Sequence, residues 1–198
     1  MTQIFGKFIE ELPKQEEYLV IGFSPASVSL QERWANNGLS ADFIADYFKT
    51  FFVSKMEQIN QEGNFGLENL RDAVKYVANE LLENAMKFQD SSVAYTAKIG
   101  FSIYHDRLIF LVSNGIRESQ VEPLQIFINK LLTTDPSEMY FHTMKTNAKN
   151  NNAYSRLGLL SMVCDYSAEL GWKLEKTDTD PPITVINTMV CLEINAIL

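Results

Sequence analysis

The clearest periodic pattern in the sequence is an apolar stripe with helical spacing over residues 67–89. Its members recur at intervals of three and four residues: Leu67, Leu70, Val74, Val77, Leu81, Ala85 and Phe88. This spacing places all of them on one face of a helix. The pattern therefore predicts an amphipathic helix whose apolar face is buried in the core.

Further segments also have helical patterns. Residues 41–60 carry a mostly aromatic stripe that follows an N-cap residue, Ser40. Residues 118–132 are moderately helical, and residues 157–170 form an apolar helical pattern that ends at Gly171. These segments predict a layer of helices.

Runs rich in β-branched and aromatic residues predict strands between the helices. They lie at residues 17–24, 92–104, 107–113, 172–177 and 183–194. A short polar turn joins the second run to the third, and Asp180-Pro181-Pro182 separates the last two. Each of these pairs is predicted to form an antiparallel hairpin.

Several stretches without apolar periodicity are predicted to be loops. The chain from residue 25 to Gly38 is one, and the Asn114-Gly115 pair is predicted to end the strand over 107–113. Residues 133–155 are polar and rich in Asn, which predicts a long loop there.

This order of elements predicts the fold class. Two hairpins favour a largely antiparallel sheet, and long amphipathic helices need one apolar surface to cover. We expect an α/β (α+β) two-layer sandwich with the helices on one face of the sheet. Because no repeat or linker interrupts the 198 residues, residues 1–198 are expected to form a single domain.

Composition narrows the classes of function. With 17 Lys and Arg against 25 Asp and Glu, the net charge is −8, which repels a phosphate backbone, so nucleic acid is not an expected partner. No stretch approaches the roughly 20 apolar residues of a membrane span, and no export signal is visible. We therefore expect neither a membrane partner nor export.

The cysteines and histidines are too few for a zinc site with the usual ligand spacing, because the chain has only two of each. Cys164 and Cys191 lie in apolar surroundings and are expected to be buried thiols in a reducing compartment, although a disulfide between them stays open. We expect a cytoplasmic protein.

Three polar residues of the 67–89 helix lie beside its buried stripe. Glu80, Asn84 and Lys87 are spaced at i, i+4 and i+7, so they share one face. Considered alone, this arrangement is explained by a solvated ion pair between Glu83 and Lys87, with Asn84 as a residue at the boundary of the buried stripe.

The surrounding string gives these residues a further meaning. Residues 79–88 read NELLENAMKF, which resembles the N box of the GHKL ATPases, a superfamily that includes histidine kinases, anti-sigma-factor kinases, gyrase and a class of heat-shock chaperones. The resemblance implies a Bergerat-type ATP-binding fold with ATP and Mg²⁺ as cofactors. It also implies that Asn84 holds the Mg²⁺, that Glu80 is the activating carboxylate and that Lys87 reaches a phosphate.

A second element of that family is an Asp-x-Gly-x-Gly after a strand, where the Asp receives the adenine amino group. Here the strand over 107–113 runs into Ser113, Asn114 and Gly115, so Ser113 replaces the Asp and the second Gly is absent. Ser113 or Asn114 could still accept one hydrogen bond from adenine. On its own, the segment is an ordinary Asn-Gly turn.

The third family element is a Gly-rich segment that opens a helix beneath the phosphates. This chain has SRLGLL at residues 155–160, in which Gly158 is kept and Arg156 adds a positive charge. The N-H groups at a helix N-terminus favour anions, so phosphate binding is compatible with this segment, as is a plain helix start with an exposed Arg156. Lys145 and Lys149, in the predicted loop before it, are further phosphate candidates.

The three elements occur in the family's order over residues 65–195, which the resemblance marks as a nucleotide-binding core. Within the superfamily the pattern is most similar to the SiaB-type protein kinases of bacterial partner-switching systems. That similarity implies a MgATP-dependent Ser/Thr kinase acting on a small partner protein. The altered second and third elements leave an alternative open, an inactive interaction module that binds its partner without ATP. The aromatic helix within residues 1–64 could cap the sheet or form a homodimer surface.

Overall fold

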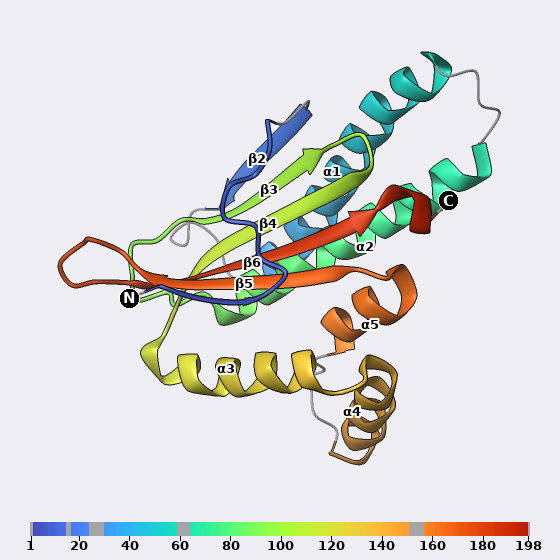
Figure 1. The fold of residues 1–198 in the computed structure, drawn as a ribbon. Helices are drawn as coiled ribbons and strands as arrows, with labels where there is room; N and C mark the ends of the chain where they lie inside the picture. The colour runs from blue at the N-terminus through green and yellow to red at the C-terminus, as the bar shows by residue number, and fades with distance from the viewer. Residues whose placement is uncertain (1, 15–16, 24–29, 59–63, 151–156, 198) are drawn as a thin grey trace.

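The computed structural model describes residues 2–14, 17–23, 30–58, 64–150 and 157–197. Figure 1 shows the elements, which in chain order are β1 (Gln3–Gly6), β2 (Glu17–Phe23), α1 (Leu30–Gln58), α2 (Asn64–Phe88), β3 (Ala97–Ile103), β4 (Arg107–Ile116), α3 (Glu118–Thr133), α4 (Pro136–Asn150), α5 (Leu157–Tyr166), β5 (Glu169–Lys176), β6 (Thr184–Glu193) and a short 3-10 helix, η1 (Ile194–Ala196).

The strands form one six-stranded sheet in the order β1-β5-β6-β4-β3-β2. Every neighbouring pair in this order is antiparallel. The predicted hairpins are β3–β4 and β5–β6. At the centre, β4 pairs with β6 along its whole length, from Arg107 opposite Glu193 to Ile116 opposite Thr184. The predicted antiparallel sheet is confirmed.

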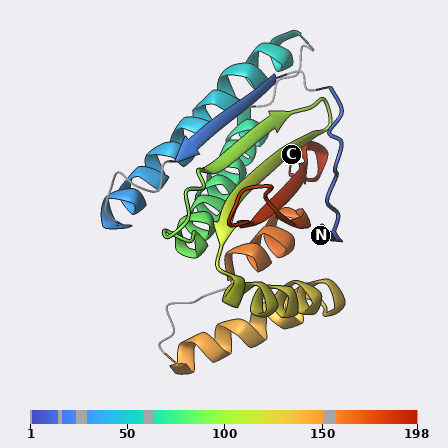
Figure 2. The same cartoon turned by 90° about the vertical axis from the view of Figure 1, so that its left-hand side faces the viewer.

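Helices α1 and α2 pack against each other and cover one face of this sheet, as Figures 1 and 2 show. Phe48 of α1, Leu81 of α2 and Phe110 of β4 meet in the core and are at most 1% exposed. On the opposite face, the segment after β1 packs three apolar side chains against β4 and β6: Phe8, Ile9 and Leu12. The predicted two-layer sandwich is confirmed, and the burial of apolar area on the helical side is its main stabilising contribution.

The predicted loop up to Gly38 is wrong from Leu30 onward, because α1 begins at that residue. Asn and Gly have low helix propensity, which suggested a break before Ser40. The structure instead buries Asn37 to 1% exposure within the continuous helix. The local preference of these residues therefore does not decide where α1 begins.

The long loop predicted over 133–155 is also wrong, since residues 136–150 form α4. Its start is capped by Asp135, whose Oδ1 accepts a hydrogen bond from the Glu138 N–H at 2.9 Å. Pro136 occupies the first helical position, where its missing N–H costs nothing. Among the α4 side chains that the structure describes, only Met139 is buried, so the apolar stripe is too short to show as a periodicity. The Asp-Pro-Ser-Glu sequence at residues 135–138 is the feature of the sequence that indicates a helix start here.

Three predicted element ends were misplaced. The strand predicted to start at residue 92 begins at Ala97. The other two ends are those of β4 and of α5. β4 does not stop before Asn114 but continues to Ile116, because its last residues still pair with β6. The helix predicted to reach residue 170 ends at Tyr166, since Ser167 adopts a left-handed conformation with φ of 53° and β5 begins at Glu169. In both cases pairing in the sheet outweighs the local sequence signal.

The N-terminal strand and the exposure of Cys164 differ from the sequence predictions. β1 was not predicted, because its four residues are too few for a pattern. Cys191 is buried as expected, but Cys164 is exposed on α5, and neither is in a disulfide. Among the helices of the described residues, none combines the length and apolar character needed to cross a bilayer.

Candidate nucleotide-binding site

A cavity of about 190 Å³ lies between the sheet and helices α2, α3 and α5. Its sheet side is mostly apolar, with Val112, Trp172 and Ile186 from strands β4, β5 and β6, and carries two polar residues, Asn114 and Thr188. Helix α3 adds a mixed wall: Ser119, Gln120, Pro123, Leu124 and Phe127. An apolar enclosure with a few polar groups is typical of sites that bind small molecules.

Helix α2 brings two predicted site residues into this cavity. Its apolar stripe packs on the sheet, so the residues at the edge of the stripe lie along the side of the cavity. Asn84 and Lys87 both line it, and both are partly exposed. Lys87 Nζ also lies 5.6 Å from the centre of the Phe88 ring, a cation–π contact. The predicted grouping of Asn84 and Lys87 is thus present in three dimensions.

Glu80 lies one turn before Asn84 and contacts the first turn of α5. The Glu80 carboxylate lies against Gly158, a residue that lines the cavity. It occupies the position that a Cβ atom on residue 158 would need, so such an atom would overlap Glu80 Oε2. Only glycine permits this approach. The sequence analysis named Glu80 and Gly158 separately, and the structure brings them into contact.

The environment of Glu80 changes its acidity. Burial raises the pKa of its carboxyl above the usual 4.5, the negative charge of Glu83 raises it further, and the positive charge of Lys87 acts in the opposite direction. Glu80 does not itself line the cavity but lies against Gly158, which does. A carboxyl with a raised pKa in this position is a candidate general base.

Strand β4 separates the residues of the second motif onto opposite faces of the sheet. Asn114 points to the helical side and lines the cavity, whereas Ser113 and Gly115 do not. The Ser113 hydroxyl donates a hydrogen bond to Asn187 Oδ1 on β6. Gly115 packs against Val93, Tyr95 and Ile183. Only Asn114 of this motif therefore faces the cavity.

Asn114 carries an unusual feature. Its side chain is only 4% exposed, yet its Nδ2 has no hydrogen-bond partner among the described residues. A buried amide donor without a partner costs about 1–3 kcal/mol, so such groups usually have a ligand or an ordered water beside them. Asn114 lines the cavity, although its Nδ2 atom is itself enclosed and has almost no accessible surface.

The end of β4 is held in place by the segment that follows α2. The Asp90 N–H donates to the Gly115 carbonyl at 2.8 Å, and the Gly115 N–H donates to Gln89 Oε1 at 3.1 Å. Asp90 in turn accepts hydrogen bonds from the Ser92 hydroxyl and N–H, and these, with Arg117 nearby, hold the pKa of Asp90 below its usual range. These contacts fix Asn114 against the cavity.

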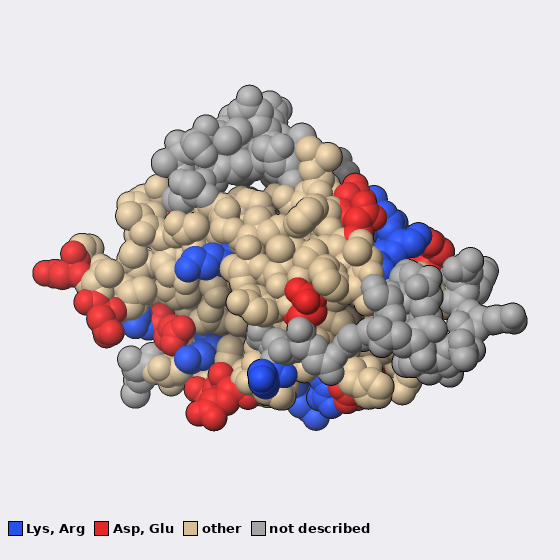
Figure 3. Space-filling view, turned by 90° about the horizontal axis from the view of Figure 1, so that it is seen from above, with Lys and Arg blue, Asp and Glu red and all other residues tan. Residues whose placement is uncertain are grey.

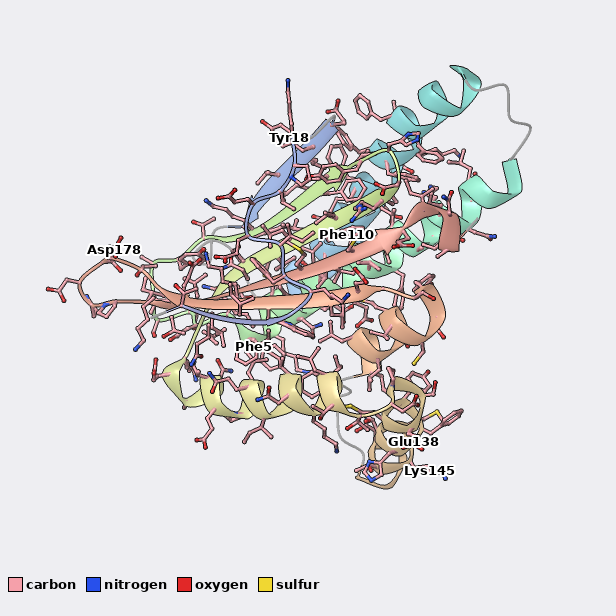
Figure 4. The ribbon with its side chains drawn as sticks, in the orientation of Figure 1. Phe5, Tyr18, Phe110, Glu138, Lys145 and Asp178 are labelled. Carbon is pink, nitrogen blue, oxygen red and sulfur yellow. The ribbon has the colours of Figure 1, made fainter. Side chains whose placement is uncertain are left out.

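Of the other predicted phosphate contacts, the described residues test only Lys145. Arg156 lies outside the described residues, and Lys149 lies on α4, where only its backbone is described. Lys145 also lies on α4, at the opposite end of the molecule from Tyr18 in Figure 4, and does not line the cavity. The α3 wall was not predicted at all, because its residues carry no motif.

These observations define an α/β two-layer protein with a mostly apolar cavity beside helix α2, which carries Asn84 and Lys87. The fold is similar to that of a chain in a solved structure, "The crystal structure of SiaB-SiaC complex from Pseudomonas aeruginosa", with a TM-score of 0.51 over 88% of this chain and 89% of that chain. The two sequences are 15% identical, so the similarity establishes a shared fold. No family model matches the sequence, and no curated protein matches it.

Proposed function

We propose that this protein binds MgATP and transfers its γ-phosphoryl group to a Ser or Thr hydroxyl of a small partner protein. The observation that carries the proposal is the buried amide of Asn114, with its unpartnered Nδ2, in an apolar cavity that Asn84 and Lys87 also line. An Asn amide offers a donor and an acceptor side by side, which is the pattern that pairs with the edge of adenine. The residues present therefore fit the nucleotide.

The size of the cavity supports a place for the base alone. At about 190 Å³ it is smaller than the roughly 300–1,000 Å³ of pockets that enclose a whole small molecule. Its apolar walls suit a flat aromatic ring. In this proposal the sugar and phosphates lie outside the cavity, beyond Asn84 and Lys87.

The α2 residues have distinct roles in the proposal. The Asn84 side-chain oxygen is a ligand suited to Mg²⁺, an ion that neutralises phosphate charge when it is bound. Lys87 adds positive charge for the phosphates. Glu80 orients the acceptor hydroxyl and takes its proton, a role for which the raised pKa of its carboxyl is suited.

Two observations support the partner and kinase parts of the proposal. The N box resemblance over residues 79–88 implies phosphoryl-transfer chemistry. The structure with the similar fold is a complex of two proteins, SiaB and SiaC. We infer that a second, small protein is the phosphoryl acceptor in a signalling role.

A substitution on β4 tests nucleotide binding. Asn114→Leu keeps the side-chain size but removes the donor and acceptor, so ATP should bind about 5- to 150-fold more weakly, the cost of about 1–3 kcal/mol for unpaired polar groups. Titration calorimetry with ATP and Mg²⁺ measures this change.

Ser113→Ala is the matched control, because Ser113 is the adjacent residue on β4 but faces the opposite side of the sheet. It should leave ATP affinity unchanged. Equal effects of the two substitutions would argue against adenine in this cavity.

One observation favours a second candidate function. Ser113 and Gly115, which hold family positions for the base, face away from the cavity. If the wild-type protein binds no ATP, the fold serves as an interaction module that regulates a partner without nucleotide.

A further inference from the structure

The sheet has an open edge at β2. This strand is last in the strand order and pairs only with β3, so its outer backbone groups face no other described strand. Its side chains alternate, and Tyr18 and Val20 project from the side opposite the helices with exposures of 60% and 58%. An edge strand with exposed apolar side chains is a template for another strand.

Helix α1 carries an aromatic stripe along the same edge. Leu39, Phe43, Tyr47 and Phe51 are spaced four residues apart, and Tyr47 contacts the rings of both Phe43 and Phe51. Tyr47 fixes the stripe to β2, because its hydroxyl donates to Glu17 Oε1 and also lies 3.1 Å from the Tyr18 carbonyl. Strand and stripe form one surface, which we call the β2/α1 edge.

The β2/α1 edge holds half of the exposed large apolar side chains of the described residues. Of the ten with this character, five lie here: Tyr18, Val20, Leu39, Phe43 and Phe51. Figure 3 views the molecule from the side on which β2 lies in Figure 1, and shows a broad uncharged area with isolated charged residues. Exposed apolar patches of this kind mark protein interfaces.

We propose that the β2/α1 edge binds a second copy of this chain, with the two β2 strands pairing antiparallel about a two-fold axis at Val20. The two sheets then become one continuous sheet, and the aromatic stripes of the two α1 helices meet on its helical side. This inference does not depend on nucleotide binding.

The sequence of β2 is complementary to itself in this arrangement. The register centred on Val20 pairs all seven residues of the strand, 17–23, and sets Tyr18 opposite Gly22 of the second copy. An aromatic ring over an edge glycine covers backbone that would otherwise be exposed. Leu19 faces Ile21 of the second copy, and the only charge, Glu17, faces Phe23, so no like charges oppose each other. This self-complementarity favours a second copy over an unrelated strand.

Mass measurement by light scattering tests the assembly. The wild-type protein should have twice the 22.6 kDa of one chain at micromolar concentration. Val20→Lys places two like charges face to face, and Phe43→Glu places charge in the stripe, so each should give monomers. Ile126→Lys, on α3 and equally exposed at 63%, should stay dimeric. A monomeric wild-type protein, or dimers that survive both edge substitutions, would overturn the proposal.

Cross-linking tests the register. In a Cys164→Ser background, Val20→Cys faces its own copy across the axis, at a Cα separation of about 4.5–5.5 Å that a disulfide spans. Mild oxidation should therefore give a covalent dimer. Tyr18→Cys lies about four residues from its copy along the strand and should not form one. Efficient linkage at Tyr18→Cys and none at Val20→Cys would refute the Val20-centred pairing.

Discussion

Asn84→Ala is expected to abolish Mg²⁺-dependent ATP binding while leaving the fold intact. Asn84 lines the cavity, and its amide oxygen is the metal ligand in the proposed site. Without the ion, the negative charges of the triphosphate are less neutralised, and a protein of net charge −8 repels them. Affinity for MgATP, measured by calorimetry, should fall to the weak level that the wild-type protein shows in EDTA.

The matched control is Asn79→Ala on the same helix. Asn79 donates to Glu83 Oε1 at 2.8 Å and does not line the cavity, so this substitution should leave MgATP affinity unchanged. Because Asn84 is partly exposed, its loss should not lower the thermal midpoint of the free protein by more than a small amount. Wild-type affinity in Asn84→Ala would remove Asn84 from the metal site.

Glu80→Gln is expected to separate phosphoryl transfer from binding. Gln keeps the size of the side chain beside Gly158 but cannot take a proton, so MgATP affinity should change little. General-base catalysis contributes about 10²–10⁴-fold, so the rate of ATP turnover, measured as ADP released, should fall by about this factor. Comparable losses of affinity and turnover would exclude Glu80 from the chemistry.

The pH dependence of turnover gives an independent check on Glu80. A general base must be ionised, and burial raises the pKa of this carboxyl above 4.5. Activity should therefore be present above the raised pKa and should be lost on acidification through it, beginning at a pH higher than an exposed Glu would give. Glu83→Gln removes a negative charge that also raises this pKa, so the acidic limb should move to lower pH, while turnover above it should stay within a few-fold.

The sequence predicted five of the six strands, helix α2 and the part of α1 from residue 41 onward, because their patterns are clear. The stripe from Leu67 to Phe88 has enough turns to define a helix, and β2, β3 and β6 are rich in β-branched residues. It did not predict α4, which packs on the core mainly through Met139 and Tyr140, or β1, which is stabilised by its pairing with β5. These short elements depend on contacts between distant residues, and a single sequence does not display such contacts.

The sequence grouped the candidate site residues only on one helix, and it named Asn114 and Gly158 through separate motifs. Glu80, Asn84 and Lys87 share a face through helical spacing, so the sequence alone grouped them. The choice between Ser113 and Asn114 depended on which face of β4 turns toward the helices, a property set by the pairing of β4 with β6. The wall from α3, including Gln120 and Phe127, required the tertiary arrangement.

The thermal midpoint of the protein with and without millimolar ATP, in Mg²⁺ and in EDTA, tests the central claim most directly. Ligand at about 100 times its dissociation constant adds about 2.7 kcal/mol to the free energy of unfolding. For a domain of this size that corresponds to a rise of about 5–10 °C. The account predicts this rise with ATP and Mg²⁺ and a much smaller one in EDTA. An unchanged midpoint with ATP and Mg²⁺ would contradict it.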